Sequence, residues 1–216
     1  MNNLKVSFND QWIGKPIKDD DGKLWYNGKR VYPGYGWINY EESFDEIFDA
    51  LTITGLAIGP VVKGGRRIKE NFISHSLALV DIDEGMTIEE LLEDDFYQSY
   101  GAGYYVSPSH TDEHHRFRII FRLERDITDY DELRFLYIGL QTVFNKADTK
   151  CRDGSRLFYG TIKAQRKEIR PNVLPLKMIK ALIVIGREED SKEFNRQSLT
   201  QYQIQWQEPS DPPASE

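Results

Sequence analysis

The sequence predicts an α+β protein with a mostly antiparallel sheet in a split βαβ arrangement. Apolar runs of strand length occur at Leu77–Asp83, Gly103–Ser107, Phe117–Leu123 and Ser155–Gly160. Helical spacing of apolar residues follows the first of these runs and returns after the third. The resulting order is strand–helix–strand–strand–helix–strand, which is the order of a split βαβ core.

Residues 1–70 form a separate pattern, which we expect to be an N-terminal α/β unit that packs on the core. Asn27-Gly28 lies between two short aromatic-rich runs and predicts a β-hairpin. Ser43 followed by Glu46 predicts a capping box that opens a helix. The core is then expected over residues 71–185, and a polar segment that leads into a disordered linker over residues 186–216.

Two further helix starts are indicated in the core. Thr87 and Glu90 have capping-box spacing before Ile88 and Leu91. Thr128 and Asp131 have similar spacing, and the apolar positions of the helix that follows keep a helical period, namely Leu133, Leu136, Tyr137, Leu140 and Phe144.

Composition fits a folded soluble chain of 216 residues with 39% hydrophobic and 29% charged residues. The net charge of −7 by itself argues against a nucleic-acid binder. The distribution argues otherwise, because residues 81–95 hold eight carboxylates and no Lys or Arg, whereas residues 150–170 hold seven Lys or Arg and two carboxylates. One cysteine, no signal peptide and no apolar run long enough to cross a membrane predict a cytoplasmic protein.

The first candidate site is Asp81-Ile82-Asp83. Residues two apart in a strand point to the same face, so the two carboxylates converge while Ile82 faces the core. Paired carboxylates suit a hard divalent cation such as Mg²⁺. The alternative is a strand end that turns polar as it leaves the core.

The second candidate is Ser107-Pro108-Ser109-His110, which directly follows a predicted strand. Hydroxyls, backbone N–H groups and one imidazole at a sheet edge suit a triphosphate. We interpret His114 and His115 as surface residues and His75 as structural.

A third candidate runs from Asp148 through Asp153 to Arg156, where carboxylates and cations precede a predicted strand. An ordinary loop with surface charges is the alternative. A weaker fourth feature is Lys63-Gly64-Gly65-Arg66-Arg67, a turn that can hold phosphate or simply lie exposed. Cys151 lies beside basic residues, and we interpret it as an inert thiol.

Three stretches together resemble the archaeo-eukaryotic primases, above all the primase–polymerase domains of phages, plasmids and other mobile elements. They are LALVDIDEG, YYVSPSHTDEHHRFRIIFRL and NKADTKCRDGSRLFYG. The three motifs of that family are matched by Asp81-Ile82-Asp83, by Pro108-Ser109-His110 and by Ala147-Asp148, with Asp153 as the fallback for the third. The resemblance covers residues 53–162.

The resemblance implies a DNA-dependent primase or polymerase of the α+β, RNA-recognition-like fold, in the replication of a phage or mobile element. Asp81, Asp83 and Asp148 would be catalytic and would hold two Mg²⁺ or Mn²⁺ ions. Nucleoside or deoxynucleoside triphosphate would be bound by Ser107, Ser109, His110, Arg118, Arg156 and Lys63.

The same resemblance implies a single-stranded DNA template or primer as partner and allows a replicative helicase domain or protein. Template phosphates would be contacted by the basic stretch, namely Lys150, Arg152, Lys163, Arg166 and Lys167. Two other functions stay open: a metal-dependent nuclease that uses the same carboxylates, and a catalytically silent replication initiator or single-strand-binding module.

Overall fold

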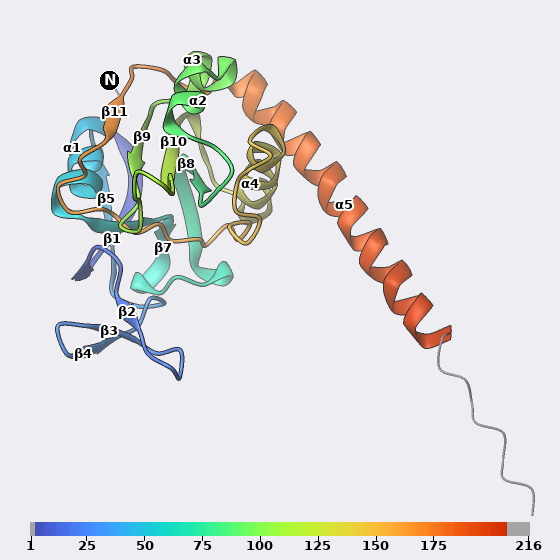
Figure 1. Cartoon of the computed structure of the whole chain (residues 1–216), viewed down its shortest axis with the longest axis horizontal. Coiled ribbons are helices and arrows are strands. Elements are labelled where there is room, and N and C mark those ends of the chain that lie inside the picture. Colours follow the sequence, from blue (N-terminus) through green and yellow to red (C-terminus); the bar gives the residue numbers. More distant parts are fainter. Residues whose placement is uncertain (1–2, 207–216) are drawn as a thin grey trace, which may run out of the picture.

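A five-stranded antiparallel sheet forms the centre of the computed structural model, which describes residues 3–206 and, for residues 195–206, only the helical backbone. Its strand order is β11-β9-β10-β8-β7 (Figure 1). The strands are β7 (Val61–Val62), β8 (Phe72–Ile82), β9 (Gly103–Val106), β10 (Phe117–Ile127) and β11 (Lys167–Ile169). β8 and β9 flank β10 and are antiparallel to it, so the two flanking strands run in the same direction.

The N-terminal segment forms two smaller sheets. The first has the order β5-β1-β6 and comprises β1 (Leu4–Ile13), β5 (Trp37–Glu42) and β6 (Leu56–Gly59). It packs against β8, and the backbone N–H of Lys5 donates to Ser76 Oγ at 2.7 Å. The second is the ribbon β2 (Ile17–Lys18), β3 (Leu24–Tyr26) and β4 (Lys29–Val31), which Figure 1 shows beyond the end of the first.

Helices α2 (Ile88–Glu93), α3 (Asp95–Tyr100) and α4 (Tyr130–Val143) lie on the other side of the central sheet, and α5 (Leu176–Trp206) packs against α4. α1 (Phe44–Asp49) belongs to the N-terminal segment and lies on the side of that segment, where the Arg122 guanidinium of β10 lies over the Phe44 ring. The Phe96 ring of α3 lies 5.9 Å from both Phe121 of β10 and Phe144, which follows α4. Short turns complete the chain, namely η1 (Ala50–Thr54), η2 (Lys63–Gly65) and η3 (Lys69–Asn71).

α5 packs on the outer side of α4 and then extends away from the body of the molecule (Figure 1). Two glycines allow the close approach of these helices. A Cβ atom on Gly139 would lie 2.1 Å from the Leu182 carbonyl oxygen, and one on Gly186 would lie 2.0 Å from that of Phe135. Any larger residue at either position would push the helices apart. Within residues 3–206, no helix has both the length and the apolar character of a membrane span.

Most predicted elements are confirmed. The three central strands, the capping boxes at Ser43 and Thr87, and the hairpin at Asn27-Gly28 are all present. Both turn residues of that hairpin have positive φ, at 49° and 72°, as a type I′ turn requires. The mixed helical and antiparallel architecture is the α+β class that the sequence predicts.

Two predictions about elements need correction. Ser155–Gly160 is not a strand, because Phe158 makes only an isolated bridge to Ile58, and β11 forms the outer edge instead. The cap of α4 is Asp129, whose side chain accepts from the Glu132 N–H at 2.8 Å, one residue after the predicted cap. Residues 186–206, the first part of the predicted polar segment, continue α5. The predicted linker at 207–216 lies outside the described residues.

Candidate active site

The first two motifs meet at one edge of the central sheet. Ile82 of β8 pairs with Phe117 of β10, and Phe117 pairs with Val106 of β9. Because β8 and β9 run in the same direction, both end at this edge, and the residues that follow them leave the sheet side by side. Asp83 and Ser107 therefore lie at the same edge, although 24 positions separate them in the sequence.

Asp81 forms a buried ion pair inside this edge. It is paired in register with Arg118, and the Arg118 Nε lies 3.1 Å from Asp81 Oδ1. Both atoms are buried, and neither makes a hydrogen bond within the described residues, so the contact is an ion pair without an aligned N–H. Arg118 Nη1 donates to the Tyr159 carbonyl at 2.6 Å. Burial opposes the charge of Arg118, but Asp81 and Tyr105 outweigh burial and raise its pKa.

Asp148 is attached directly to the first motif. Its backbone N–H donates to the Asp81 carbonyl at 2.9 Å, which joins residues that are far apart in the sequence. The Asp148 Oδ1 accepts from the Lys150 N–H at 2.9 Å, so a tight turn orients this carboxylate. Asp83 is exposed to solvent, but the protein atoms around it remove part of its hydration. This partial desolvation, followed by the negative charges of Asp81 and Asp148, raises the pKa of Asp83.

The three carboxylates fit a divalent cation in chemistry and charge, but they are not arranged as a ligand set. Within residues 3–206, no group of three or more His, Cys, Asp or Glu side chains is placed to hold a metal ion. Asp81 is directed at Arg118, and its Oδ1 is buried without a hydrogen bond. A bound Mg²⁺ or Mn²⁺ ion would neutralise the mutual repulsion of these carboxylates. Such an ion would compete with Arg118 for Asp81.

A pocket of about 280 Å³ opens beside Asp81, between the central sheet and the N-terminal unit. Three guanidinium groups and two carboxylates line it, together with Pro33, Leu157 and Tyr159; the charged residues are Arg67, Arg118, Arg156, Asp81 and Asp153. The Arg156 guanidinium has no hydrogen bond or ion pair with any described residue. Arg67 donates to the carbonyls of Pro33 and Ser155, and no carboxylate of the described side chains lies in ion-pair contact with it. Cations thus predominate in the pocket, which suits an anionic ligand.

The fallback carboxylate Asp153 lines this pocket but is already engaged. Its Oδ1 accepts hydrogen bonds from the Tyr130 hydroxyl and from the Ser155 N–H. Asp148 rather than Asp153 is bonded to the backbone of Asp81. The geometry therefore favours Asp148 as the third carboxylate.

His110 is half-buried in the loop after β9, and Ser107 at the start of the loop is buried. His110 Nδ1 accepts from the Arg116 N–H at 3.1 Å, whereas its Nε2 is buried and has no hydrogen bond with the described residues. Burial, and then the nearby His115 and Arg166, lower the pKa of His110. At neutral pH the ring is uncharged, so with Nδ1 accepting, Nε2 carries the proton and can donate it. Ser109 is half-buried, and its N–H donates to Ser107 Oγ at 3.3 Å.

His115 is not the surface residue that we expected, although His114 is exposed. The Ile88 N–H donates to His115 Nδ1 at 2.9 Å, and the ring packs edge-on against His110 with 5.4 Å between centroids. A polar sequence around the residue gave no indication of this contact with the first turn of α2.

The basic residues assigned to phosphate and template are dispersed. Lys63 lies on the exposed turn η2 and does not line the pocket, whereas Arg67 does. The Gly-Gly-Arg-Arg turn was the signal for Arg67, but the sequence could not tell which cation faces inward.

Of the residues proposed for template binding, Lys150 and Lys163 are exposed. The other three have partners within the chain: Arg152 pairs with Glu193, Arg166 with Glu89, and Lys167 Nζ donates to Thr52 Oγ1 at 2.9 Å. Cys151 is buried, and burial raises its pKa to about 12, as an inert thiol requires.

Comparison with known proteins gives little more than a resemblance in fold. No protein-family model matches the chain, and no curated protein matches it in sequence. Similar solved structures include the AEP domain (PP-N190) of the primase–polymerase of cyanophage S-2L, at 12% identity and a TM-score of 0.47. The match covers 84% of this chain and 89% of that one. A likeness this distant says nothing about activity, so the residues of the site must carry any functional conclusion.

Proposed function

We propose that the protein is a template-directed nucleotidyltransferase, a primase–polymerase that adds nucleotides from NTP or dNTP on single-stranded DNA. The observation that carries the proposal is the bond from the Asp148 N–H to the Asp81 carbonyl at 2.9 Å. It joins the third motif to the first, and the charges of both residues contribute to the raised pKa of Asp83. Three carboxylates beside a pocket in which cations predominate suit metal-assisted transfer of a phosphate group.

In this proposal Asp81, Asp83 and Asp148 hold two Mg²⁺ or Mn²⁺ ions. Bound ions of this kind neutralise the charge on the entering and leaving oxygens of the phosphoryl group. Asp148 is oriented by its own turn, and Asp83 is exposed to the incoming substrate. Arg118 balances the buried charge of Asp81 before any cation binds.

The triphosphate is held by two groups of donors. The first group is Arg156, Arg67 and Arg118, which line the pocket. His110 Nε2 and the hydroxyl of Ser109 would contribute donors from the loop after β9, at the same end of the sheet as Asp83. Guanidinium groups make paired bonds to phosphate oxygens, so three of them suit the β- and γ-phosphates. The exposed Lys150 and Lys163 would contact template phosphates.

A primer-extension assay tests the proposal. The wild-type chain is incubated with a primed and an unprimed single-stranded DNA, labelled NTP or dNTP, and Mg²⁺ or Mn²⁺. We expect extended products from wild type and none from Asp83→Asn. Glu84→Gln is the matched control, because Glu84 is the exposed neighbour of Asp83 and has the same charge, and we expect wild-type extension from it.

Three outcomes would overturn the proposal. The first is no extension with either metal. The second is equal extension by wild type and Asp83→Asn, which would mean that the extension does not depend on the candidate site. The third is shortening of the labelled DNA by wild type without any extension, which would assign the carboxylates to a nuclease.

A further inference from the structure

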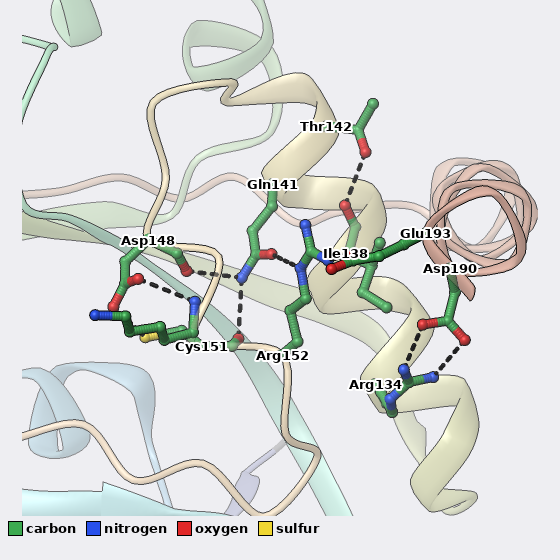
Figure 2. Close-up of polar contacts among 10 residues, drawn as sticks. Arg134, Ile138, Gln141, Thr142, Asp148, Cys151, Arg152, Asp190 and Glu193 are labelled. Carbon is green, nitrogen blue, oxygen red and sulfur yellow. Dashed lines mark hydrogen bonds and ion pairs between the residues drawn. The ribbon is translucent and has the colours of Figure 1, made fainter. Parts of the chain in front are cut away.

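Gln141 of α4 is a buried amide that binds the turn carrying Asp148. Its Nε2 donates to the Asp148 carbonyl at 3.1 Å and to the Cys151 carbonyl at 3.0 Å (Figure 2). Its Oε1 accepts from Arg152 Nε at 2.9 Å. Both amide protons and the amide oxygen are therefore used on one turn, residues 148–152, and a rigid α4 holds that turn.

Arg152 extends this contact to the C-terminal helix. Its Nη1 pairs with the Glu193 carboxylate of α5, as Figure 2 shows. A polar cavity of about 280 Å³ runs along the pair, lined by Gln141, Thr142, Asn145, Arg152, Glu189 and Glu193. The connection thus reaches from α5 through Arg152 and Gln141 to the Asp148 turn.

A second ion pair joins α4 directly to α5 without touching the turn. Arg134 of α4 pairs with Asp190 of α5, one helical turn before Glu193 (Figure 2). The side-chain exposures are alike, at 31% and 33% for this pair and 28% and 48% for Arg152 and Glu193. Both pairs bind α5 at partly exposed positions, but only the Arg152–Glu193 pair reaches the turn that carries Asp148.

We infer that Gln141, Arg152 and Glu193 are positioning residues for the Asp148 carboxylate. The Asp148 Oδ1 accepts from the backbone of its own turn, so the direction of the carboxylate follows the backbone of residues 148–151. That backbone is fixed from two sides, by the Asp81 carbonyl and by Gln141. The consequence for metal binding rests on the proposed function, whereas the control of the turn does not.

Cys151, the single cysteine of the chain, reports on the turn directly. It is buried, and Gln141 binds its carbonyl, so a thiol reagent reaches it only when the turn opens. We expect Gln141→Leu to label about tenfold faster than wild type, because two buried carbonyls lose their donor. Glu193→Ala should label a few-fold faster, and the matched control Asp190→Ala should label at the wild-type rate.

The labelling rates decide the inference without any metal or nucleotide. Equal rates for wild type and Gln141→Leu would overturn it, and so would equal acceleration by Glu193→Ala and Asp190→Ala, which would reflect helix packing alone. Glu193→Ala, at a partly exposed position, keeps the test valid if Gln141→Leu does not fold.

The Mn²⁺ dependence of primer extension then tests the link to Asp148. For Gln141→Leu, we expect the Mn²⁺ concentration at half-maximal rate to rise about tenfold, with most of the rate recovered at saturating Mn²⁺. Faster labelling with unchanged Mn²⁺ dependence would restrict Gln141 to a structural role. Failure of wild type to extend any primer would instead remove the proposed function and leave the labelling result standing.

Discussion

The two ends of the β8–β10 ladder arrange their charged groups in opposite ways. At the far end, Ser76 Oγ donates to Asp126 Oδ1 at 2.6 Å, and Lys5 Nζ lies 2.8 Å from Asp126 Oδ2. The Lys5 N–H completes the group by donating to Ser76 Oγ. At the candidate site, Asp81 Oδ1 and Arg118 Nε face each other without an aligned hydrogen bond, and Asp83 has two carboxylates nearby.

The pKa shifts record the same contrast. Burial by itself would raise the pKa of Asp126, but hydrogen bonds from Lys5 and Ser76 lower it overall. Burial and the charges of Asp81 and Asp148 raise the pKa of Asp83. The polar groups at the far end are therefore paired with one another and stabilise the fold. The candidate site instead holds like charges close together, which is typical of a ligand-binding site.

The largest expected effect separates the two carboxylates beside the site. We expect Asp148→Ala to reduce primer extension by about 100- to 1,000-fold, since removing one group that stabilises transition-state charge has a cost of this order. Asp153→Ala should reduce it only a few-fold, because Asp153 is occupied by Tyr130 and Ser155. Initial rates at saturating Mn²⁺ give the comparison, and the reverse order would make Asp153 the third ligand.

The next effect concerns acid stability at the far end. His75 is fully buried, and its burial lowers its pKa to about 4, against weaker opposing effects of Lys5 and Asp126. The unfolded chain binds a proton near pH 6.5 and the folded chain does not, so His75 contributes stability above pH 6.5 that is lost as the pH falls towards 4.

His75→Leu should remove this loss. Between pH 7 and pH 4.5 we expect wild type to lose about 2–3 kcal/mol more unfolding free energy than the variant, as the shift in pKa implies. Urea unfolding at the two pH values measures the difference. An equal loss in both proteins would mean that other groups, and not His75, set the acid sensitivity.

Asp126→Asn tests the group of paired side chains at the far end of the ladder, formed by Lys5, Ser76 and Asp126. It should lower the unfolding free energy by about 1 kcal/mol at pH 7, mainly through the hydrogen bond from buried Ser76, because the exposed Lys5 pair is screened. The pKa of Asp126 is lowered, so its contribution is present above its ordinary value of 3.8 and disappears as the pH falls through the folded-state pKa. The difference in urea midpoint between the variant and wild type should therefore be smaller at pH 3 than at pH 7.

The sequence predicted the elements whose pattern matches their packing. β8, β9 and β10 are apolar runs, and the capping boxes at Ser43 and Thr87 have local hydrogen bonds that spacing alone reveals. The sequence did not predict β11, because Lys167-Glu168-Ile169 pairs with β9 through its backbone and fully buries no apolar side chain. Ser155–Gly160 misled for the opposite reason: Phe158 is buried, yet the segment makes only an isolated bridge to Ile58 of β6, and the Ser155 carbonyl accepts from the Arg67 side chain.

The features of the candidate site also divide into those that the sequence could predict and those that it could not. Strand periodicity could place Asp81 and Asp83 on one face, and the order of the motifs pointed to Asp148. The attachment of Asp148 to Asp81, the entry of Arg67 into the pocket and the clamp by Gln141 depend on contacts between residues far apart in the sequence. No local pattern encodes such contacts, because they follow from how the loops pack and not from residue spacing.

The smallest expected effect has the opposite sign to that of Asp126→Asn. Asp83→Asn should raise the unfolding free energy at pH 7 by a few tenths of a kcal/mol, since Asp83 is exposed and solvent screens its repulsion from Asp81 and Asp148. Its raised pKa means that the carboxylate costs stability above that pKa, and the cost vanishes as the pH falls through it.

Urea midpoints at low ionic strength, with Glu84→Gln as the matched control, measure the Asp83 effect. Millimolar Mn²⁺ should stabilise wild type and Glu84→Gln but not Asp83→Asn, because a cation relieves the same repulsion and binds only the folded chain. A lower midpoint for Asp83→Asn at pH 7 would show that the Asp83 carboxylate stabilises the fold, as the paired groups at the far end of the ladder do. Equal stabilisation of all three proteins by Mn²⁺ would show that the ion does not bind at Asp83.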